Sequence, residues 1–145
     1  MTHSLAVQCL TCAWMAAIGW YVQLVHYPAF LRIKPEEWGS FHAFHSAMTG
    51  VLVVGPMLAQ TAATAWCFVL APLDRKSWLL AACWLLSFGW TLAVTGPMHG
   101  RLAPGTLQTE VPRLIASCWV RSIAWSFQAL IAAWLLARMA ESPVR

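Results

Sequence analysis

The chain has 145 residues, of which 60% are hydrophobic and only 10% are charged, and its mean hydropathy is +0.63. A soluble domain usually carries about 25% charged residues, so this composition excludes an ordinary water-soluble protein. The formal net charge is +4, but the basic residues form no patch interleaved with aromatics, so nucleic acid is not an expected partner. The length allows one domain, which we take as residues 1–145.

Four segments of the chain each contain the roughly 20 apolar residues that a membrane-spanning helix needs. Pro28 follows the first segment, and the turn Asp74-Arg75-Lys76 separates the second from the third. Gly96-Pro97 ends the third, and Pro112 begins the fourth, where proline suits a first helical turn. Short connections predict an all-α, four-transmembrane-helix antiparallel bundle, which we expect in the bacterial inner (cytoplasmic) membrane. The predicted spans are residues 5–27, 41–70, 77–97 and 112–137.

The residues at the ends of the predicted spans are consistent with this topology, but they do not indicate which end of the bundle faces the cytoplasm. Lys and Arg residues are distributed almost evenly between the two ends of the predicted bundle, so the positive-inside rule leaves the membrane orientation open. Several tryptophans fall near predicted helix ends, where aromatic belts form at the membrane surface. They are Trp38, Trp66, Trp78 and Trp134.

Four of the five histidines are predicted to lie at the same end of the bundle. His26 ends the first span, His42 and His45 begin the second, and His99 follows the third. Helical spacing places each of them on a polar stripe of its helix, and polar side chains in a span usually face the bundle interior. The sequence therefore predicts a cluster of imidazoles at one membrane face. His3 lies at the other end and is interpreted as an ordinary terminal residue.

Converging imidazoles are typical of a transition-metal site. The sequence predicts such a site with His26, His42, His45 and His99 as ligands, where Fe or Cu would suit redox chemistry and Zn would imply a hydrolytic or structural site. Glu36 or Glu37, in the connection before the second span, is a further ligand candidate or a hydrogen-bond acceptor for a metal-bound imidazole. In the alternative interpretation, each histidine only bonds to lipid headgroups or to a neighbouring helix.

Arg121 is the second candidate for chemistry, because it lies about two turns into the fourth predicted span. A charge at the centre of a span costs at least about 2.5 kcal/mol on insertion scales. A catalytic Arg121 would contact an anion or a substrate carboxylate beside the histidines. Alternatively, its side chain extends to the membrane surface, which lowers the cost. The sequence does not decide between these two roles.

Three short motifs carry a family resemblance: residues 20–28 (WYVQLVHYP), residues 96–102 (GPMHGRL) and Trp119-Val120-Arg121. They resemble small four-helix bacterial integral membrane proteins similar to the anthrone-oxygenase-like family, whose third helix also ends in a proline, a polar residue and a leucine. That family is associated with Asn at the polar position, where this chain has His99. The aromatic-rich first span has a weaker likeness to membrane protoporphyrinogen oxidase, which is a four-helix, haem-binding protein.

Together these patterns lead to one main functional hypothesis and two alternatives. The main hypothesis is a metal-dependent membrane oxidoreductase or oxygenase, with an open metal position for oxygen or water and Arg121 orienting a hydrophobic substrate. The first alternative is a haem-binding electron-transfer or haem-handling protein that uses haem b with two axial histidines. The second is a non-enzymatic, metal-binding accessory subunit. The expected partners are membrane lipid, a hydrophobic small molecule, and either further copies of the chain or a larger membrane complex.

Overall fold

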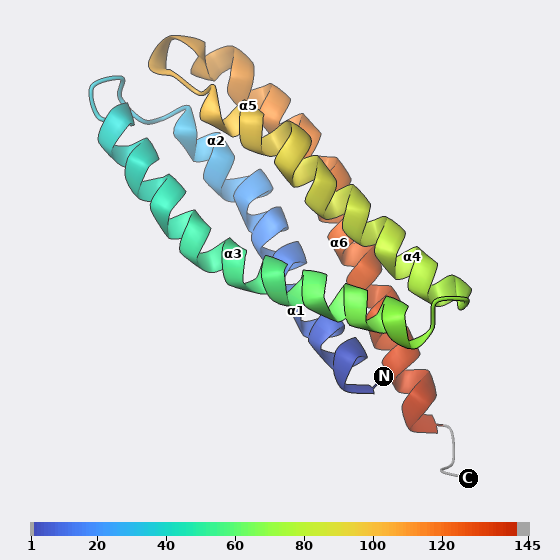
Figure 1. The fold of residues 1–145 in the computed structure, drawn as a ribbon. Helices are drawn as coiled ribbons and strands as arrows, with labels where there is room; N and C mark the ends of the chain where they lie inside the picture. Colours follow the sequence, from blue (N-terminus) through green and yellow to red (C-terminus); the bar gives the residue numbers. More distant parts are fainter. Residues whose placement is uncertain (1, 142–145) are drawn as a thin grey trace.

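The computed structural model describes residues 2–141, in which all regular secondary structure is helical, with no strand. Four helices are long and apolar enough to cross a membrane: Thr2–Phe30, Trp38–Leu70, Arg75–Gly100 and Pro104–Glu141. They lie side by side with consecutive helices running in opposite directions, so the two ends of the described chain lie at the same end of the molecule (Figure 1). The expected all-α architecture is confirmed.

The first and third long helices contain π-helical segments. The first long helix consists of α1 (Thr2–Tyr21), the π-helical η1 (Val22–His26) and α2 (Tyr27–Phe30). The second long helix is α3 (Trp38–Leu70). The third long helix consists of α4 (Arg75–Trp84), the π-helical η2 (Leu85–Gly89) and η3 (Thr91–Thr95), and α5 (Gly96–Gly100). A short 3-10 turn, η4 (Pro104–Thr106), precedes the last helix, α6 (Leu107–Glu141).

The helix ends predicted at three prolines are wrong, because each helix continues past its proline. The residues before Pro28 and Pro97 donate their backbone N–H groups five residues back, from Tyr27 to the Val22 carbonyl and from Gly96 to the Thr91 carbonyl. This wider turn accommodates a proline, which has no N–H and crowds the carbonyl four residues before it. The last helix begins at Leu107, well before Pro112. Residues 28–30 and 98–100 therefore belong to the helices.

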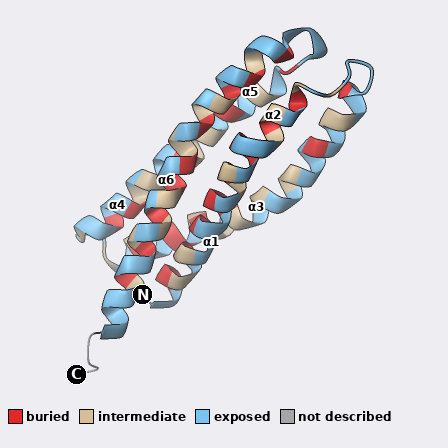
Figure 2. Ribbon diagram, turned by 180° about the vertical axis from the view of Figure 1, so that it is seen from behind, coloured by how far each residue is buried: buried red, intermediate tan, exposed pale blue. Residues whose placement is uncertain are grey.

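The helices bury a narrow interior and expose apolar outer faces. Helix α1 contacts both α3 and α6, and α4 contacts the same two helices. Figure 2 shows the buried residues along the facing sides of the helices, with exposed residues outside. Many exposed side chains are large and apolar, such as Leu10 (72%) and Val51 (74%). Helices α1 and α6 approach closely at Gly19, where an added Cβ would lie 3.0 Å from Ser122 Oγ, as is common for small residues between membrane helices.

The interior is polar in its centre, as the predicted stripes require. Gln8, Gln23, Gln60 and Gln128 are all 0% exposed. Gln60 Nε2 donates to Gln128 Oε1 at 2.7 Å, and Trp125 Nε1 donates to Gln60 Oε1 at 3.2 Å. Buried polar groups of this kind need partners, and these two bonds join one helix to the next, whereas the amide nitrogens of Gln8 and Gln23 have no partner within residues 2–141.

Candidate functional site

The structure brings the four predicted histidines together at one end of the molecule. His26 Nε2 lies 2.7 Å from His45 Nδ1, and His45 Nε2 lies 2.9 Å from His99 Nε2. Three imidazoles from three different helices therefore form a continuous chain, with His45 in the middle. His42, one helical turn before His45, completes what we call the imidazole cluster: His26, His42, His45 and His99.

His42 is stacked against two neighbouring rings. Its ring lies 4.8 Å from the His99 ring, at an interplanar angle of 25°, and 5.1 Å from the Trp38 ring, at 18°. Within residues 2–141, His42 Nε2 is buried and has no hydrogen-bond partner. A buried nitrogen without a partner loses the hydrogen bonds that it would make in water. The cluster thus contains one imidazole nitrogen that remains available for a ligand.

Aromatic side chains fix the orientation of the imidazoles. Phe30, which is 0% exposed, contacts His45 edge-on at 5.0 Å between ring centroids and His26 at 5.3 Å. The Tyr27 ring lies 5.9 Å from the His99 ring. Thr49 Oγ1 lies 3.2 Å from His45 Nδ1, the same nitrogen that faces His26. Rotation of His45 would therefore disrupt both the polar contacts and the packing around it.

Sequence reasoning missed Tyr27, Phe30 and Trp38 as parts of the site. The first span was expected to stop at Pro28, which left Phe30 outside the bundle, whereas the helix continues to Phe30. Trp38 was expected at the membrane surface, whereas it is 4% exposed and stacked on His42. The available signal was the short spacing of aromatic residues around His26 and His42.

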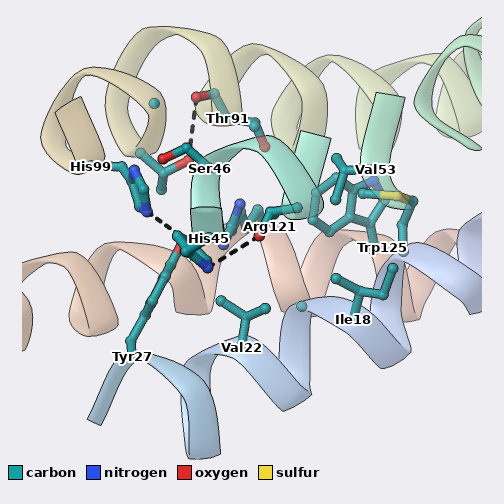
Figure 3. A pocket seen from close by; sticks show the side chains of 15 residues that line it. Ile18, Val22, Tyr27, His45, Ser46, Val53, Thr91, His99, Arg121 and Trp125 are labelled. Carbon is teal, nitrogen blue, oxygen red and sulfur yellow. Dashed lines mark hydrogen bonds between the residues drawn. The ribbon is translucent and has the colours of Figure 1, made fainter. Parts of the chain in front are cut away.

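A cavity of about 220 Å³ lies beside the cluster. Figure 3 shows His45 and His99 facing each other at one end of this cavity, with Arg121 and Trp125 along its wall. Most of the remaining wall is apolar, as at Ile18 and Val53. The cavity therefore combines imidazole, guanidinium and apolar surfaces in one space, which we call the Arg121 cavity.

Arg121 lines the cavity beside the neutral side chains of Trp125, Tyr27 and Cys118. Its guanidinium lies 5.8 Å from the centre of the Trp125 ring, a cation–π arrangement, and it interacts with the Tyr27 hydroxyl and the Cys118 thiol. Its Nε atom is buried and has no hydrogen-bond partner in the described part of the chain. Over the same residues, the Arg113–Glu110 pair is an ion pair at 2.8 Å, and no carboxylate pairs with Arg121.

The structure does not place the two glutamates with the cluster. Glu36 and Glu37 are exposed in the connection before α3, and Glu37 makes no side-chain cap to that helix. Within residues 2–141, no group of three or more His, Cys, Asp or Glu is already arranged as a metal centre. The imidazole cluster is therefore hydrogen-bonded and stacked rather than preformed around an ion. His3 is exposed at the other end of the molecule.

Comparisons with models of known protein families, with curated proteins and with solved structures found no match for this chain. The resemblance to the anthrone-oxygenase-like family stays a prediction.

Proposed function

We propose that the four long helices cross the membrane as an antiparallel bundle and hold the imidazole cluster near one face of the bilayer. Their apolar composition, their exposed apolar outer faces and the buried glutamines between them support this arrangement. Trp66, Trp78 and Trp134 are 64%, 59% and 53% exposed, as side chains of an aromatic belt would be. The bacterial inner membrane is the proposed location.

We further propose that the protein is a metal-dependent oxidoreductase or oxygenase that acts on a hydrophobic substrate. The observation that carries this proposal is the meeting of His45, His99 and Arg121 at one largely apolar cavity. Polar and charged groups inside a membrane bundle are costly and usually functional. A bundle that needed only stability would not place two imidazoles and a guanidinium around an open space.

We propose a three-histidine site that forms only if the rings rearrange, since no group of three ligands is already arranged for an ion in residues 2–141. Two nitrogens that bind one ion at about 2.0–2.1 Å lie roughly 3 Å apart, and the Nε2 atoms of His45 and His99 are separated by 2.9 Å. His42, stacked on His99, supplies the third nitrogen, the buried Nε2 that has no partner in the described chain. The rings must turn and the shared proton must leave, because His45 Nε2 and His99 Nε2 now face each other in a hydrogen bond in which one of them donates.

In this arrangement His26 is a supporting residue and not a ligand. The Nδ1–H of a metal-bound His45 would donate to His26 Nε2, which lies 2.7 Å away. Metal-binding imidazoles usually donate their second ring N–H to such an acceptor, which fixes the tautomer and the ring orientation. An iron or copper ion held by imidazoles would supply redox chemistry, while the Arg121 cavity would position the substrate and exclude water.

Metal analysis of the detergent-purified full-length protein tests this proposal. Elemental analysis should find a stoichiometric amount of Fe or Cu, and the optical spectrum should lack a Soret band. Zinc alone would contradict redox chemistry and indicate a hydrolytic or structural site. A Soret band would indicate haem b. That alternative has less support, because the His45 and His99 rings are in contact, and a haem held between these two residues would have to separate them.

A second function is favoured by one specific observation, the unbroken chain His26–His45–His99. A neutral imidazole donates with one nitrogen and accepts with the other, so this chain would pass a proton between the partly exposed His26 and the Arg121 cavity. Such a relay needs no metal. A metal-free protein that still requires His45 for function would support the relay and contradict the metal site. Metal binding without turnover, together with a co-purifying partner, would instead indicate an accessory subunit.

A further inference from the structure

The charge of Arg121 has no compensating anion in the described protein. No Asp or Glu lines the Arg121 cavity, and the acidic residues of the chain lie in the connections or near helix ends. An unpaired charge in a low-dielectric interior is unfavourable. The nearby imidazoles do not help, because protonating any of them would add positive charge. A bound anion would neutralise the site.

The Arg121 guanidinium is the hydrogen-bond donor that the cavity offers to a ligand. The hydroxyls of Thr91 and Thr95 already donate to backbone carbonyls of their own helix, at 2.7 Å and 3.2 Å. The Arg121 guanidinium interacts with the Tyr27 hydroxyl and the Cys118 thiol. Its buried Nε has no hydrogen-bond partner within residues 2–141. The Nε–H and one Nη–H form the edge of a guanidinium that grips both oxygens of a carboxylate.

The shape of the interior suits a ligand with an apolar chain. A second cavity of about 210 Å³ lies between α1–η1 and α3, and it shares His45 and Thr49 with the Arg121 cavity. Its outer wall includes Phe44 and Leu52, which are 66% and 52% exposed on the side of α3. An apolar chain with its head at Arg121 would therefore extend past Thr49 to the lipid-facing surface.

We infer that the Arg121 cavity binds a lipophilic carboxylate, with the carboxylate paired to the Arg121 guanidinium and the apolar chain directed between α1–η1 and α3. Its role as the substrate rests on the proposed oxidoreductase function, but the binding itself does not require the metal. The lipophilic carboxylate enters from the bilayer, which concentrates it at the exposed outer wall of the second cavity.

Equilibrium binding of radiolabelled dodecanoate to the full chain in lipid nanodiscs tests this inference, with empty nanodiscs to subtract partitioning into lipid. Binding should be saturable, and Arg121→Gln should weaken it at least about tenfold, because a charge-assisted pair is lost. Arg121→Lys should give intermediate affinity, since lysine keeps the positive charge but lacks the planar pair of N–H donors that binds both oxygens of a carboxylate. Arg113→Gln is the matched control, because Arg113 is exposed and lies outside the cavity, and it should bind like the wild type.

Two competitors separate the head groups. 1-Dodecanol, which has the same chain without the charge, should compete weakly and equally well in the wild type and in Arg121→Gln. Dodecyl phosphate should compete less well than dodecanoate. Tighter binding of dodecyl phosphate would assign the site to a phosphate head group and would overturn the inference that the ligand is a carboxylate. The inference also fails if wild-type binding does not saturate, or if Arg121→Gln binds dodecanoate within about twofold of wild type.

A second variant covers the case in which Arg121→Gln does not fold. Ser46 is exposed and lines the Arg121 cavity, so Ser46→Phe should fill the space without burying a new group in the core. It should abolish dodecanoate binding, and unchanged binding would overturn the inference. Metal content measured on the same samples separates the two proposals. Arg121-dependent binding by a metal-free wild type would refute only the metal site, and a metal-loaded protein without dodecanoate binding would refute only this inference.

Discussion

His45 and His99 contact each other through their Nε2 atoms at 2.9 Å, although 54 residues separate them in the chain. The contact joins α3 to the last turn of α5 at the edge of the Arg121 cavity. Both rings are packed by Phe30, so the pair is held in place by apolar contacts as well as by its polar one. The pair connects the other two histidines of the imidazole cluster, since His26 contacts His45 and His42 stacks on His99. We expect His42 to be a metal ligand and His26 to support one.

The first prediction concerns the proposed ligands. His42→Ala and His99→Ala should each lower bound metal at least about tenfold, because loss of a ligand is expected to exceed the effect of losing a supporting residue. Metal per chain, measured by elemental analysis, is the readout. His3→Ala is the control, because His3 is exposed at the opposite end, and its metal content should be unchanged. Wild-type metal content in both ligand variants would refute the site.

A second prediction distinguishes His26 from the ligands. His26→Ala should weaken metal affinity about 10- to 100-fold, as for loss of a hydrogen-bond acceptor to a ligand. His26→Gln should recover part of this loss, because its amide oxygen can accept from His45 Nδ1, whereas His99→Gln should recover nothing. Titration with the metal identified in the wild type gives the affinities. Equal losses for the Gln substitutions at positions 26 and 99 would make His26 a fourth ligand.

Both the helices and the meeting of the histidines could be predicted from the positions of the apolar stretches along the chain. Apolar stretches of this length give spanning helices, and alternation of direction brings His26, His45 and His99 to one end. The polar stripes that carry the histidines also explain the buried glutamines, because polar side chains in a span usually face the interior, and Gln60 and Gln128 are both 0% exposed. These features depend on the length, order and polar spacing of the helical segments, all of which are visible in one sequence.

The helix ends and the packing partners required tertiary information. Proline normally ends a helix, but the π-helical bonds to Val22 and Thr91 let the chain continue through Pro28 and Pro97. Trp38 would suit a membrane surface, yet burial against Phe30 and His42 holds it inside. The Arg121 cavity depends on how helices diverge, which no local pattern specifies.

The third prediction tests the close approach of α1 to α6. Gly19→Ala should destabilise the protein by about 1–3 kcal/mol, because the new Cβ would lie 3.0 Å from Ser122 Oγ. Moving that hydroxyl would also disturb its hydrogen bond to Gln23 Oε1. Gly50→Ala is the matched control, because nothing lies within 4 Å of its Cβ, and it should stabilise by about 0.5–1 kcal/mol. Unfolding in mixed micelles by SDS titration measures both, and equal effects would refute the close contact.

A fourth prediction addresses the membrane topology. Cysteines introduced at His3 and Ala140, in a background without the native cysteines, should be labelled by an impermeant thiol reagent from the same side of the membrane. Cysteines at Lys34 and Gly105 should be labelled from the opposite side, because they lie in the connections at the other end. All four positions are exposed, so burial does not hide them. Labelling of positions 3 and 140 from opposite sides would exclude four spans and the proposed location of the site.

The last prediction concerns the buried glutamine network below the Arg121 cavity. Gln60 donates to Gln128 Oε1 and accepts from Trp125 Nε1, and all three residues are at most 1% exposed. Gln60→Leu keeps most of the volume but leaves the indole N–H of Trp125 without its acceptor. It should destabilise the protein by about 1–3 kcal/mol, the cost of orphaning a buried polar group.

Because Trp125 also carries the cation–π contact to Arg121 at 5.8 Å, Gln60→Leu should additionally weaken dodecanoate binding while leaving metal content unchanged. Gln60→Glu should also lower stability, because an ionised carboxylate in the interior is costly and cannot donate to Gln128 Oε1. Gln108→Leu, on the exposed first turn of α6, is the control and should change stability by no more than about 0.5 kcal/mol. SDS titration and nanodisc binding provide the two readouts. If Gln60→Leu is as stable as the control, the network does not join the helices, and Trp125 is positioned by packing alone.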